Sequence, residues 1–438
     1  MRESRVNNPR LDKESGDQGH EPPTTQHEDT WQSSYRDVLE IREFRFLWLA
    51  HVLSIIGTNL LNIAASVLVY QATDSALAAG ITLAVTFLPP IIAGPLLSGL
   101  ADIFPRKQAI IVCDIARACV ILLVGIPGMA IWAIWALLFL SVVPSIPFAA
   151  ARAALLSEII QGERYVASTA IIHLTSQVGM LVGLLAGGFI VSFIGPHITV
   201  MSNAVLFLLA ALLVFIGVRT RPAPERNKDE ASSPGFFTMI GGGAKLVFTN
   251  TRLRTLALLA WLAGLYMIPY GIANPMADEL GAGDAAVGLI MAGSSIGTLI
   301  GGFTLTRFVG PPTRMRLLGP LAVLTSAPLL LWMFPMPLWL MVTLLALSGA
   351  FGAYQIVANA AFVLCAPKEG RGLAFGLVAA GLQAAQGVGI LIGGFFVELY
   401  GTEVVITGAG AIGVLGALLL ALPWSRLAGE TITLMNED

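Results

Sequence analysis

The chain carries the stretch GLLAGGFIVSFIG at residues 183–195 and a similar stretch, GILIGGFFVELYG, at residues 389–401. At an offset of 206 residues the two are identical at seven of 13 positions, and four of the shared residues are glycines. The same offset aligns Gln177 with Gln383. An apolar register alone does not align four glycines and a glutamine. We therefore expect two copies of one unit, each holding this stretch in its fifth apolar segment.

Outward from this repeat, twelve apolar segments divide six and six. Only 12% of the residues are charged and 56% are hydrophobic, against about 25% charged in soluble domains. A helix needs about 20 apolar residues to cross a bilayer, and backbone groups in lipid must bond within their own segment. The predicted spans are 45–71, 77–101, 108–126, 130–151, 167–194, 198–217, 255–276, 285–306, 315–333, 336–360, 373–397 and 404–424.

These segments predict an all-α integral membrane protein with twelve transmembrane helices. Because the repeat relates one half to the other, we expect two six-helix bundles related by a pseudo-two-fold axis, an arrangement found in secondary transporters. The halves are joined by a charged, Pro-rich linker. The predicted regions are a disordered and then amphipathic cytoplasmic tail (1–43), an N-terminal bundle (44–217), a cytoplasmic linker (218–253) that becomes helical over 236–254, a C-terminal bundle (254–424) and a cytoplasmic tail (425–438).

Charge is distributed unequally between the predicted loops. Loops after odd-numbered spans have no Lys or Arg, and their only charges are Asp74, Asp278, Glu279, Asp284, Glu398 and Glu403. The other loops and both tails hold the basic residues, apart from Arg117 inside span three. Basic residues near span ends stay in the cytoplasm. Both termini are therefore predicted to be cytoplasmic, with the protein in the plasma membrane.

The loop between spans two and three reads SGLADIFPRK, residues 98–107. Asp102 ends one predicted helix, and Arg106 and Lys107 begin the next. Asp102 is placed to pair with Arg106, or to cap unpaired backbone N–H groups at the start of a helix in the other bundle. Such a contact is worth about 1 kcal/mol. It would hold the bundles together on one side and break when they rock apart.

This loop resembles the signature of the major facilitator superfamily between spans two and three, Gly-x-Leu-Ala-Asp-Arg-x-Gly-Arg-Lys. The matching residues are Leu100, Ala101, Asp102, Arg106 and Lys107. Ser98 replaces the first glycine, with Gly99 one place along, and Ile103 and Pro105 replace the first base and the second glycine. The resemblance implies that Gly99, Asp102, Arg106 and Lys107 form a motif that controls conformational change.

Span five resembles the antiporter motif of the same superfamily, Gly-x-x-x-Gly-Pro-x-x-Gly-Gly. The matching residues are Gly179, Gly183, Gly187 and Gly188, with Leu184 at the proline position. Glycines four apart also let helices pack closely, so packing alone is the alternative. The stretches 44–50, 70–80, 113–118 and 147–158 resemble the drug-exporter subgroup that includes macrolide-efflux and siderophore-export (enterobactin exporter-like) proteins.

Asp114 and Arg117 are full charges placed well inside a predicted span. At a spacing of three residues they share one helical face and can pair, which avoids the cost of an isolated charge in lipid. Two interpretations follow. The pair is either a structural ion pair that orients span three, which we favour, or it includes a carboxylate that exchanges protons. Arg152 and Glu158, at the next loop, either join this network or are exposed.

In the superfamily's fold the first helix of each three-helix repeat lines a central cavity, so spans one, four, seven and ten are expected to do so here. Spans five and eleven add further polar residues. The lining is expected to be aromatic and rich in amides, without an acidic residue or the paired arginines that sugar phosphates need. The candidate cavity residues are His51, Asn59, Asn62, Trp135, Ser141, His173, Gln177, Tyr266, Tyr270, Asn274, Tyr354, Gln355, Asn359, Gln383 and Gln386.

Such a lining suits an amphipathic molecule held by apolar contact and a few hydrogen bonds. The resemblance and the duplication predict a monomeric secondary transporter that exports a drug-like or natural-product molecule in exchange for protons. Its expected partners are the lipid bilayer, the cargo and protons, with no nucleic acid, cofactor or metal site. The alternatives are export of a siderophore, a lysophospholipid or, less favoured, a metal ion. A membrane enzyme or receptor is a remote alternative, because the sequence has no hydrolase residue set, ATP-binding loop or large soluble domain.

Overall fold

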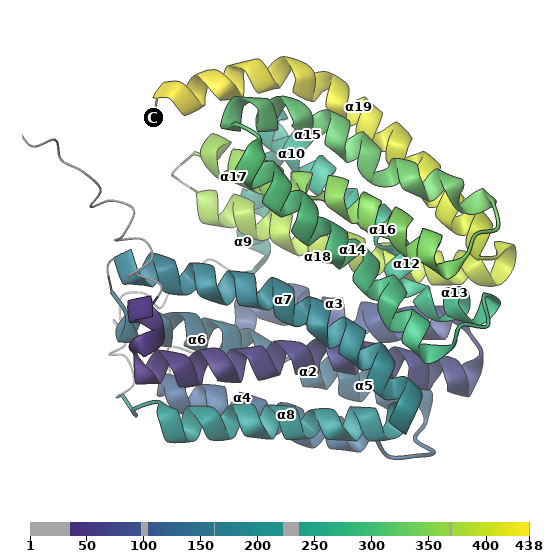
Figure 1. Cartoon of the computed structure of the whole chain (residues 1–438). Helices are drawn as coiled ribbons and strands as arrows, with labels where there is room; N and C mark the ends of the chain where they lie inside the picture. Colours follow the sequence, from purple (N-terminus) through teal and green to yellow (C-terminus); the bar gives the residue numbers. More distant parts are fainter. Residues whose placement is uncertain (1–35, 98–103, 162, 222–235, 368–369, 438) are drawn as a thin grey trace, which may run out of the picture.

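The computed structural model describes residues 36–97, 104–161, 163–221, 236–367 and 370–437 (Figure 1). In these ranges every regular element is a helix, as expected for an all-α protein. Ten helical stretches, some of them made of two or more consecutive helices, are long and apolar enough to cross a membrane. The remaining two predicted spans, 77–101 and 108–126, correspond to α3 (Ala76–Leu97) and α4 (Arg106–Val124), of which α4 carries four charged side chains.

The N-terminal half forms one bundle. Its helices are α2 (Arg42–Thr73), α3 (Ala76–Leu97), α4 (Arg106–Val124), α5 (Ile131–Val142), α6 (Ser145–Ile159), α7 (Glu163–Ile194) and α8 (Pro196–Gly217). Predicted span four is divided into α5 and α6 next to Pro144. A proline lacks the N–H group that would continue the helical ladder. Gly99 and Asp102, which the sequence placed in the conformational motif, lie outside the described residues.

The C-terminal half forms the second bundle, in which three of the predicted spans are interrupted. Its elements are α9 (Phe236–Thr249), α10 (Thr251–Trp261), α11 (Ala263–Tyr266), α12 (Ile268–Gly271), α13 (Ala273–Glu279), α14 (Gly283–Phe308), α15 (Pro311–Ser326), the 3-10 helix η3 (Ala327–Met333), α16 (Leu338–Gly352), α17 (Tyr354–Cys365), α18 (Arg371–Tyr400) and α19 (Thr402–Glu437). Interruptions of this kind leave backbone groups without their helical partners, so they must bond to neighbouring side chains or line a cavity.

Three boundaries differ from those expected from the sequence. The first long helix begins at Arg42 and continues without a break into predicted span one. The helix expected over 236–254 at the end of the linker stops at Thr249, and a separate helix, α10, begins at Thr251. The last helix runs to Glu437, so residues 425–437 continue α19. Hydropathy alone placed that boundary at the last apolar residue, although a helix continues wherever its backbone bonds are made.

The internal repeat corresponds to equivalent packing within each bundle. A Cβ atom at Gly183 of α7 would lie 2.8 Å from the carbonyl oxygen of Ile56 on α2. At the aligned position, Gly389 of α18 packs directly on the backbone of Gly264 in α11. Both contacts join the fifth span of a half to its first span. The glycines therefore permit the same close helix approach twice.

The two bundles meet through a second pair of aligned glycines. A Cβ atom at Gly188 would lie 2.7 Å from the Cα of Gly288 on α14, in the other bundle. A Cβ atom at Gly394 would lie 3.0 Å from the carbonyl oxygen of Ala76 on α3. The interface between the bundles thus consists of α7 against α14 and α18 against α3, a pseudo-symmetric arrangement.

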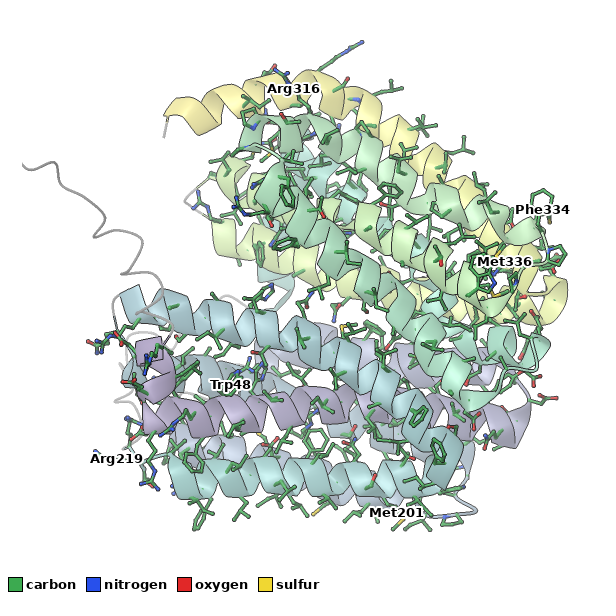
Figure 2. All side chains as sticks on the ribbon, in the orientation of Figure 1. Trp48, Met201, Arg219, Arg316, Phe334 and Met336 are labelled. Carbon is green, nitrogen blue, oxygen red and sulfur yellow. The ribbon has the colours of Figure 1, made fainter. Side chains whose placement is uncertain are left out.

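One end of the bundles carries the acidic loops after odd-numbered spans, and we call it the acidic end; the opposite end, which carries the basic loops, is the basic end. Figure 2 shows Arg219 and Arg316 towards the basic end, and Phe334 and Met336 at the acidic end. In Figure 1 the bundles converge towards the acidic end, near α13, and diverge towards the basic end.

Polar contacts between the bundles lie at or near the acidic end. Gln71 donates to both carboxylate oxygens of Asp284 (3.2 and 3.3 Å). Glu398 of α18 accepts hydrogen bonds from the Ser75 hydroxyl and, at 3.2 Å, from the backbone N–H of Leu77. Within the described residues, no hydrogen bond or ion pair joins the two bundles at the basic end. The structure is therefore closed at the acidic end and separated at the basic end.

Candidate functional site

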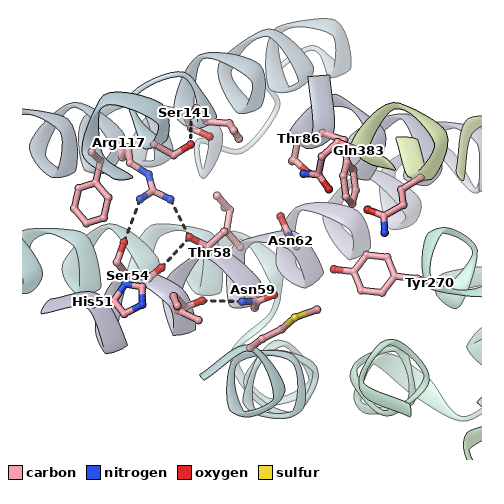
Figure 3. Close-up of a pocket in the computed structure, with 18 of the residues that line it drawn as sticks. His51, Ser54, Thr58, Asn59, Asn62, Thr86, Arg117, Ser141, Tyr270 and Gln383 are labelled. Atoms are coloured by element: carbon pink, nitrogen blue, oxygen red, sulfur yellow. Dashed lines mark hydrogen bonds between the residues drawn. The ribbon is translucent and has the colours of Figure 1, made fainter. Parts of the chain in front are cut away.

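A cavity of about 490 Å³ lies between the two bundles (Figure 3). Most of its wall comes from the N-terminal bundle, chiefly from α2. The C-terminal bundle contributes Met267, Tyr270 of α12, and Gln383 and Gln386 of α18. The full lining is His51, Ser54, Ile55, Thr58, Asn59, Leu61, Asn62, Thr86, Phe87, Arg117, Ser141, Val142, Ser145, Phe148, Arg152, Met180, Met267, Tyr270, Gln383 and Gln386.

Arg117 is the central charged group of the N-terminal wall. It extends from α4 towards α2 and donates to the hydroxyls of Ser54 (3.2 Å) and Thr58 (2.9 Å) (Figure 3). Its guanidinium also lies 4.0 Å from the centre of the Phe207 ring, a cation–π geometry. The side chain is 6% exposed. Arg117 therefore links α4, α2 and α8 at the cavity wall.

Asp114 lies behind Arg117 and is fully buried. Its Oδ1 is 3.9 Å from Arg117 Nη1, which makes the expected ion pair a loose one. Neither carboxylate oxygen accepts a hydrogen bond from any described residue. Buried carboxylates are normally satisfied by several donors, so this one is unusual. Proximity to Arg117 is its main stabilising interaction.

A second arginine, Arg152 of α6, lines the cavity beside His51. Its guanidinium contacts the His51 ring, with 2.9 Å between Arg152 Nη1 and His51 Nε2. His51 Nε2 also lies 2.9 Å from the hydroxyl of Ser176 on α7. Arg152 is 5.9 Å from the centre of the Phe148 ring. It has no acidic partner among the described residues.

The opposite part of the cavity is neutral and polar. Figure 3 shows the Tyr270 hydroxyl directed towards Asn62, with Gln383 and Thr86 beside it. Gln383 and Gln386 are partly exposed and have no hydrogen-bond partner in the described part of the chain. These amides are therefore free to bond to a molecule in the cavity.

Seven of the fifteen polar candidates named from the sequence line this cavity. They are His51, Asn59, Asn62, Ser141, Tyr270, Gln383 and Gln386. The amide of Asn59 already donates to the Ile55 carbonyl oxygen at 2.9 Å, so part of its capacity is used within α2.

The other eight candidates do not line this cavity in this conformation. Five join helices: Trp135 donates to Thr82, Asn274 to Ser66, Tyr354 to the Leu259 carbonyl, and Gln355 to both Tyr266 and the Ala260 carbonyl. His173, Gln177 and Asn359 are exposed but do not line the cavity. The break in predicted span seven accounts for part of this result, because the carbonyl groups of Leu259 and Ala260, at the end of α10, accept hydrogen bonds from Tyr354 and Gln355.

Arg117 and Arg152 are lining residues that the sequence analysis missed. Arg117 was assigned to an ion pair and Arg152 to a loop, whereas α6 continues to Ile159 and carries Arg152 into the cavity wall. The expectation of a cavity without paired arginines is therefore wrong. A sequence signal existed, since Arg152 precedes the end of the helical pattern by about two turns.

The basic residues of the loop motif act within the N-terminal bundle in this structure. Arg106 pairs with Glu158 and donates to the Ala154 carbonyl oxygen at 3.2 Å, which ties α4 to α6. Lys107 donates to the Phe215 carbonyl oxygen of α8 at 2.8 Å. Arg221 extends the network, 3.9 Å from Glu158 and 2.8 Å from Glu43. Glu158 thus pairs with Arg106 and Arg221, and neither Glu158 nor Arg152 joins the Asp114–Arg117 pair within the described residues.

The four glycines of the span-five motif divide between two surfaces. Gly179, Gly183 and Gly187 all face α2 within the bundle, whereas Gly188 faces Gly288 of the other bundle. In the described residues, no three His, Cys, Asp or Glu side chains lie together as a metal site.

The fold and the cavity together define a membrane carrier made of two similar helical bundles. The sequence matches the Major Facilitator Superfamily over residues 47–273 and again over 256–431. The chain belongs to this family, as the loop motif predicted, and the family is one of transporters. No curated protein matches the sequence.

Solved transporter structures share this fold. A mutant of the nucleoside transporter NupG is 17% identical, with a TM-score of 0.65 over 87% of this chain and 99% of that one. A POT family transporter in complex with 5-aminolevulinic acid is 11% identical, with a TM-score of 0.70 over 88% and 96%. A bacterial homologue of human lysosomal Spinster, inward-facing and unoccupied, is 14% identical, with a TM-score of 0.59 over 91% and 96%. At these identities the likeness concerns the fold alone.

Proposed function

We propose that the protein is a secondary active transporter that exports an amphipathic small molecule by alternating access, coupled to protons. The observation that carries this proposal is the cavity of about 490 Å³ lined by both bundles. A volume in this range suits a drug-sized ligand. Because the described polar contacts between the bundles lie at or near the acidic end, rocking about them would expose the cavity first to one side and then to the other.

The topology proposed is twelve spans, with α3 and α4 as spans two and three and the basic end in the cytoplasm. The distribution of basic loops supports this orientation. In that orientation the structure is the inward-facing state, ready to take cargo from the cytoplasm. A plasma-membrane location and cytoplasmic termini follow from the same arrangement.

Asp114 and Arg117 form the proposed coupling pair. Asp114 accepts no hydrogen bond from the described residues, and its ion-pair contact is the Arg117 guanidinium at 3.9 Å. A proton on Asp114 would remove its attraction for Arg117, which would then depend on the hydroxyls of Ser54 and Thr58 on α2. Protonation is thereby linked to how α4 and α2 are held at the cavity wall. A purely structural ion pair is the alternative for the same two residues.

The resemblance of several N-terminal stretches to drug exporters supports a drug-like cargo. A siderophore or a lysophospholipid exported through the same cavity is the second candidate. The lining favours an organic cargo over a metal ion, because it offers two guanidinium groups and amides in place of carboxylates.

The direct test is uptake into inside-out vesicles from a host stripped of its own pumps. A panel of fluorescent amphipathic compounds is first screened by susceptibility in that host, and the compound found is then followed in the vesicles. We expect uptake that a proton uncoupler collapses. Uptake of no compound under a proton gradient would contradict the proposal.

The coupling role is tested in the same vesicles with Asp114→Asn. We expect this variant to bind cargo and to exchange it down its own gradient, without accumulation driven by protons. Arg316→Gln, which removes an exposed charge far from the cavity, is the matched control and keeps wild-type accumulation. Proton-driven accumulation by Asp114→Asn would leave the pair a structural role only.

A further inference from the structure

We infer that the cargo carries an anionic group, and that Arg152 together with Arg117 binds it. This inference rests on the proposed transport function and specifies its substrate class. It starts from the charge of the lining, which contains two arginines and no Asp or Glu in the described part of the chain.

The two arginines differ in how their charge is compensated. Arg117 has Asp114 at 3.9 Å and two hydroxyl acceptors. Arg152 contacts only the His51 ring and the face of Phe148, and no carboxylate pairs with it among the described residues. A cation inside a membrane domain normally pairs with an anion or lines a water-filled pathway. The missing partner of Arg152 is supplied when an anionic cargo enters.

Arg152 also has hydrogen-bond donors to spare. Only its Nη1 has a partner in the described residues, and neither Nε nor Nη2 is among the buried polar atoms that lack a partner, so both remain accessible. A guanidinium with two free N–H directions is suited to bind a carboxylate, sulfonate or phosphate oxygen pair. Lys could not offer the same planar geometry.

The two guanidinium groups contact side chains on neighbouring turns of α2. Arg152 meets His51, and Arg117 meets Ser54 and Thr58. At a rise of 1.5 Å per residue, His51 and Ser54 are about 5 Å apart along the helix axis. A single anionic group placed between them can therefore interact with both charges. This places the anion at the His51 side of the cavity.

The rest of the cavity describes the remainder of the cargo. Beyond the arginines the wall combines the apolar side chains of Leu61, Phe87, Met180 and Met267 with neutral polar groups, among them Asn62, Tyr270, Gln383 and Gln386. The substrate class is thus an organic anion with an apolar body and one or two hydrogen-bonding groups. Its export also follows the membrane potential, since a negative interior repels an anion.

The test compares three probes that share one ring system and differ in charge: 2-naphthoate, 2-naphthylmethanol and 2-naphthylmethylammonium. Each is added to the purified full chain in detergent, and the thermal unfolding midpoint and equilibrium dialysis are measured. We expect 2-naphthoate to bind at least tenfold more tightly than the ammonium compound and to raise the midpoint. Equal or tighter binding of the ammonium compound, or no binding of 2-naphthoate, would overturn the inference.

Variants locate the site. Arg152→Gln is expected to lower 2-naphthoate affinity at least tenfold, Arg152→Lys to retain part of it, and the exposed control Arg316→Gln to leave it unchanged. Binding of 2-naphthylmethanol, which needs no cation, shows whether the Arg152→Gln cavity is intact. If 2-naphthoate binds Arg152→Gln as tightly as wild type, Arg152 is not its partner and the inference fails.

Failure of this inference is separable from failure of the proposed function. Binding is measured without a gradient, so an intact anion site in a protein that shows no flux would contradict export alone. Uncoupler-sensitive export of a cation that binds independently of Arg152 would support the transport function and contradict the anion site.

Discussion

The contact between Gly188 and Gly288 provides the sharpest perturbation of the two-bundle arrangement. A Cβ atom at Gly188 would lie 2.7 Å from Gly288 Cα and 2.8 Å from its backbone nitrogen, and neither backbone atom can move without shifting α14. Overpacking of this kind costs about 1–3 kcal/mol. Because this contact joins the bundles only at their closed end, the cost of Gly188→Ala falls on the present state alone. At 1.4 kcal/mol per tenfold, the equilibrium shifts about 5- to 150-fold towards the alternative state.

Gly183→Ala is the informative comparison, since it makes the same change five residues away. Its Cβ atom would lie 2.8 Å from the Ile56 carbonyl oxygen, inside the N-terminal bundle. That contact persists when the bundles rock, so the cost falls on both states equally. We expect Gly183→Ala to lower thermal stability without changing the conformational equilibrium. Gly408→Ala, where no atom lies within 4 Å, is the matched control and should change neither.

The assay is a distance measurement between spin labels at the basic ends of α7 and α14. Labels replace the exposed residues Thr169 and Arg307 in a background without the three native cysteines. In the wild type a long distance should dominate. Gly188→Ala should populate a shorter one, while Gly183→Ala and Gly408→Ala should not. An unchanged distance distribution in Gly188→Ala, with a stability loss like that of Gly183→Ala, would refute the reasoning.

Three further predictions concern single interactions. Glu398→Gln weakens the hydrogen bonds that hold Ser75 and the start of α3, so the acidic end should open more often. A loss of about 1 kcal/mol shifts the conformational equilibrium a few-fold, which the same labels measure; an unchanged distance distribution would show that the contact has no gating role. Tyr354→Phe leaves a buried carbonyl oxygen without its donor and should lower the free energy of unfolding by about 1–2 kcal/mol, with transport retained; an unaltered melting midpoint would contradict this. Glu158→Gln should cost less than about 1 kcal/mol, because its pair with Arg106 is partly exposed, and complete loss of folded protein would show a larger role.

The symmetric architecture could be predicted from the sequence because the two halves share glycines at aligned positions. Gly183 and Gly389 align, and each packs its helix against the first span of its own half. Gly188 and Gly394 also align, and each approaches the opposite bundle. Two helix backbones in direct contact leave no room for a side chain, so glycine is required at the same positions in both halves. Hydropathy predicted the helical segments, and the charges of the loops distinguished the acidic end from the basic end.

Only about half of the polar candidates predicted from the sequence line the cavity, because tertiary contacts set the rotation of each helix about its axis. An apolar helix face packs equally well against lipid or against apolar neighbours. A polar side chain can either face the cavity or bond to the free backbone groups of a broken helix. Tyr354 and Gln355 were expected in the cavity, yet they bond to carbonyl groups of α10. Arg152 was expected in a loop, yet it faces the cavity because α6 is longer than its apolar part.

The proposed mechanism requires the cavity to be open to the cytoplasm and closed to the exterior in the resting protein. The most direct measurement is the side from which a membrane-impermeant thiol reagent reaches Gln383→Cys in a cysteine-free background. We predict rapid labelling in inside-out vesicles and at least tenfold slower labelling in right-side-out vesicles, with the ratio reduced by Gly188→Ala. Labelling that is equal from both sides, or faster from the exterior, would contradict the proposed orientation and the closed acidic end.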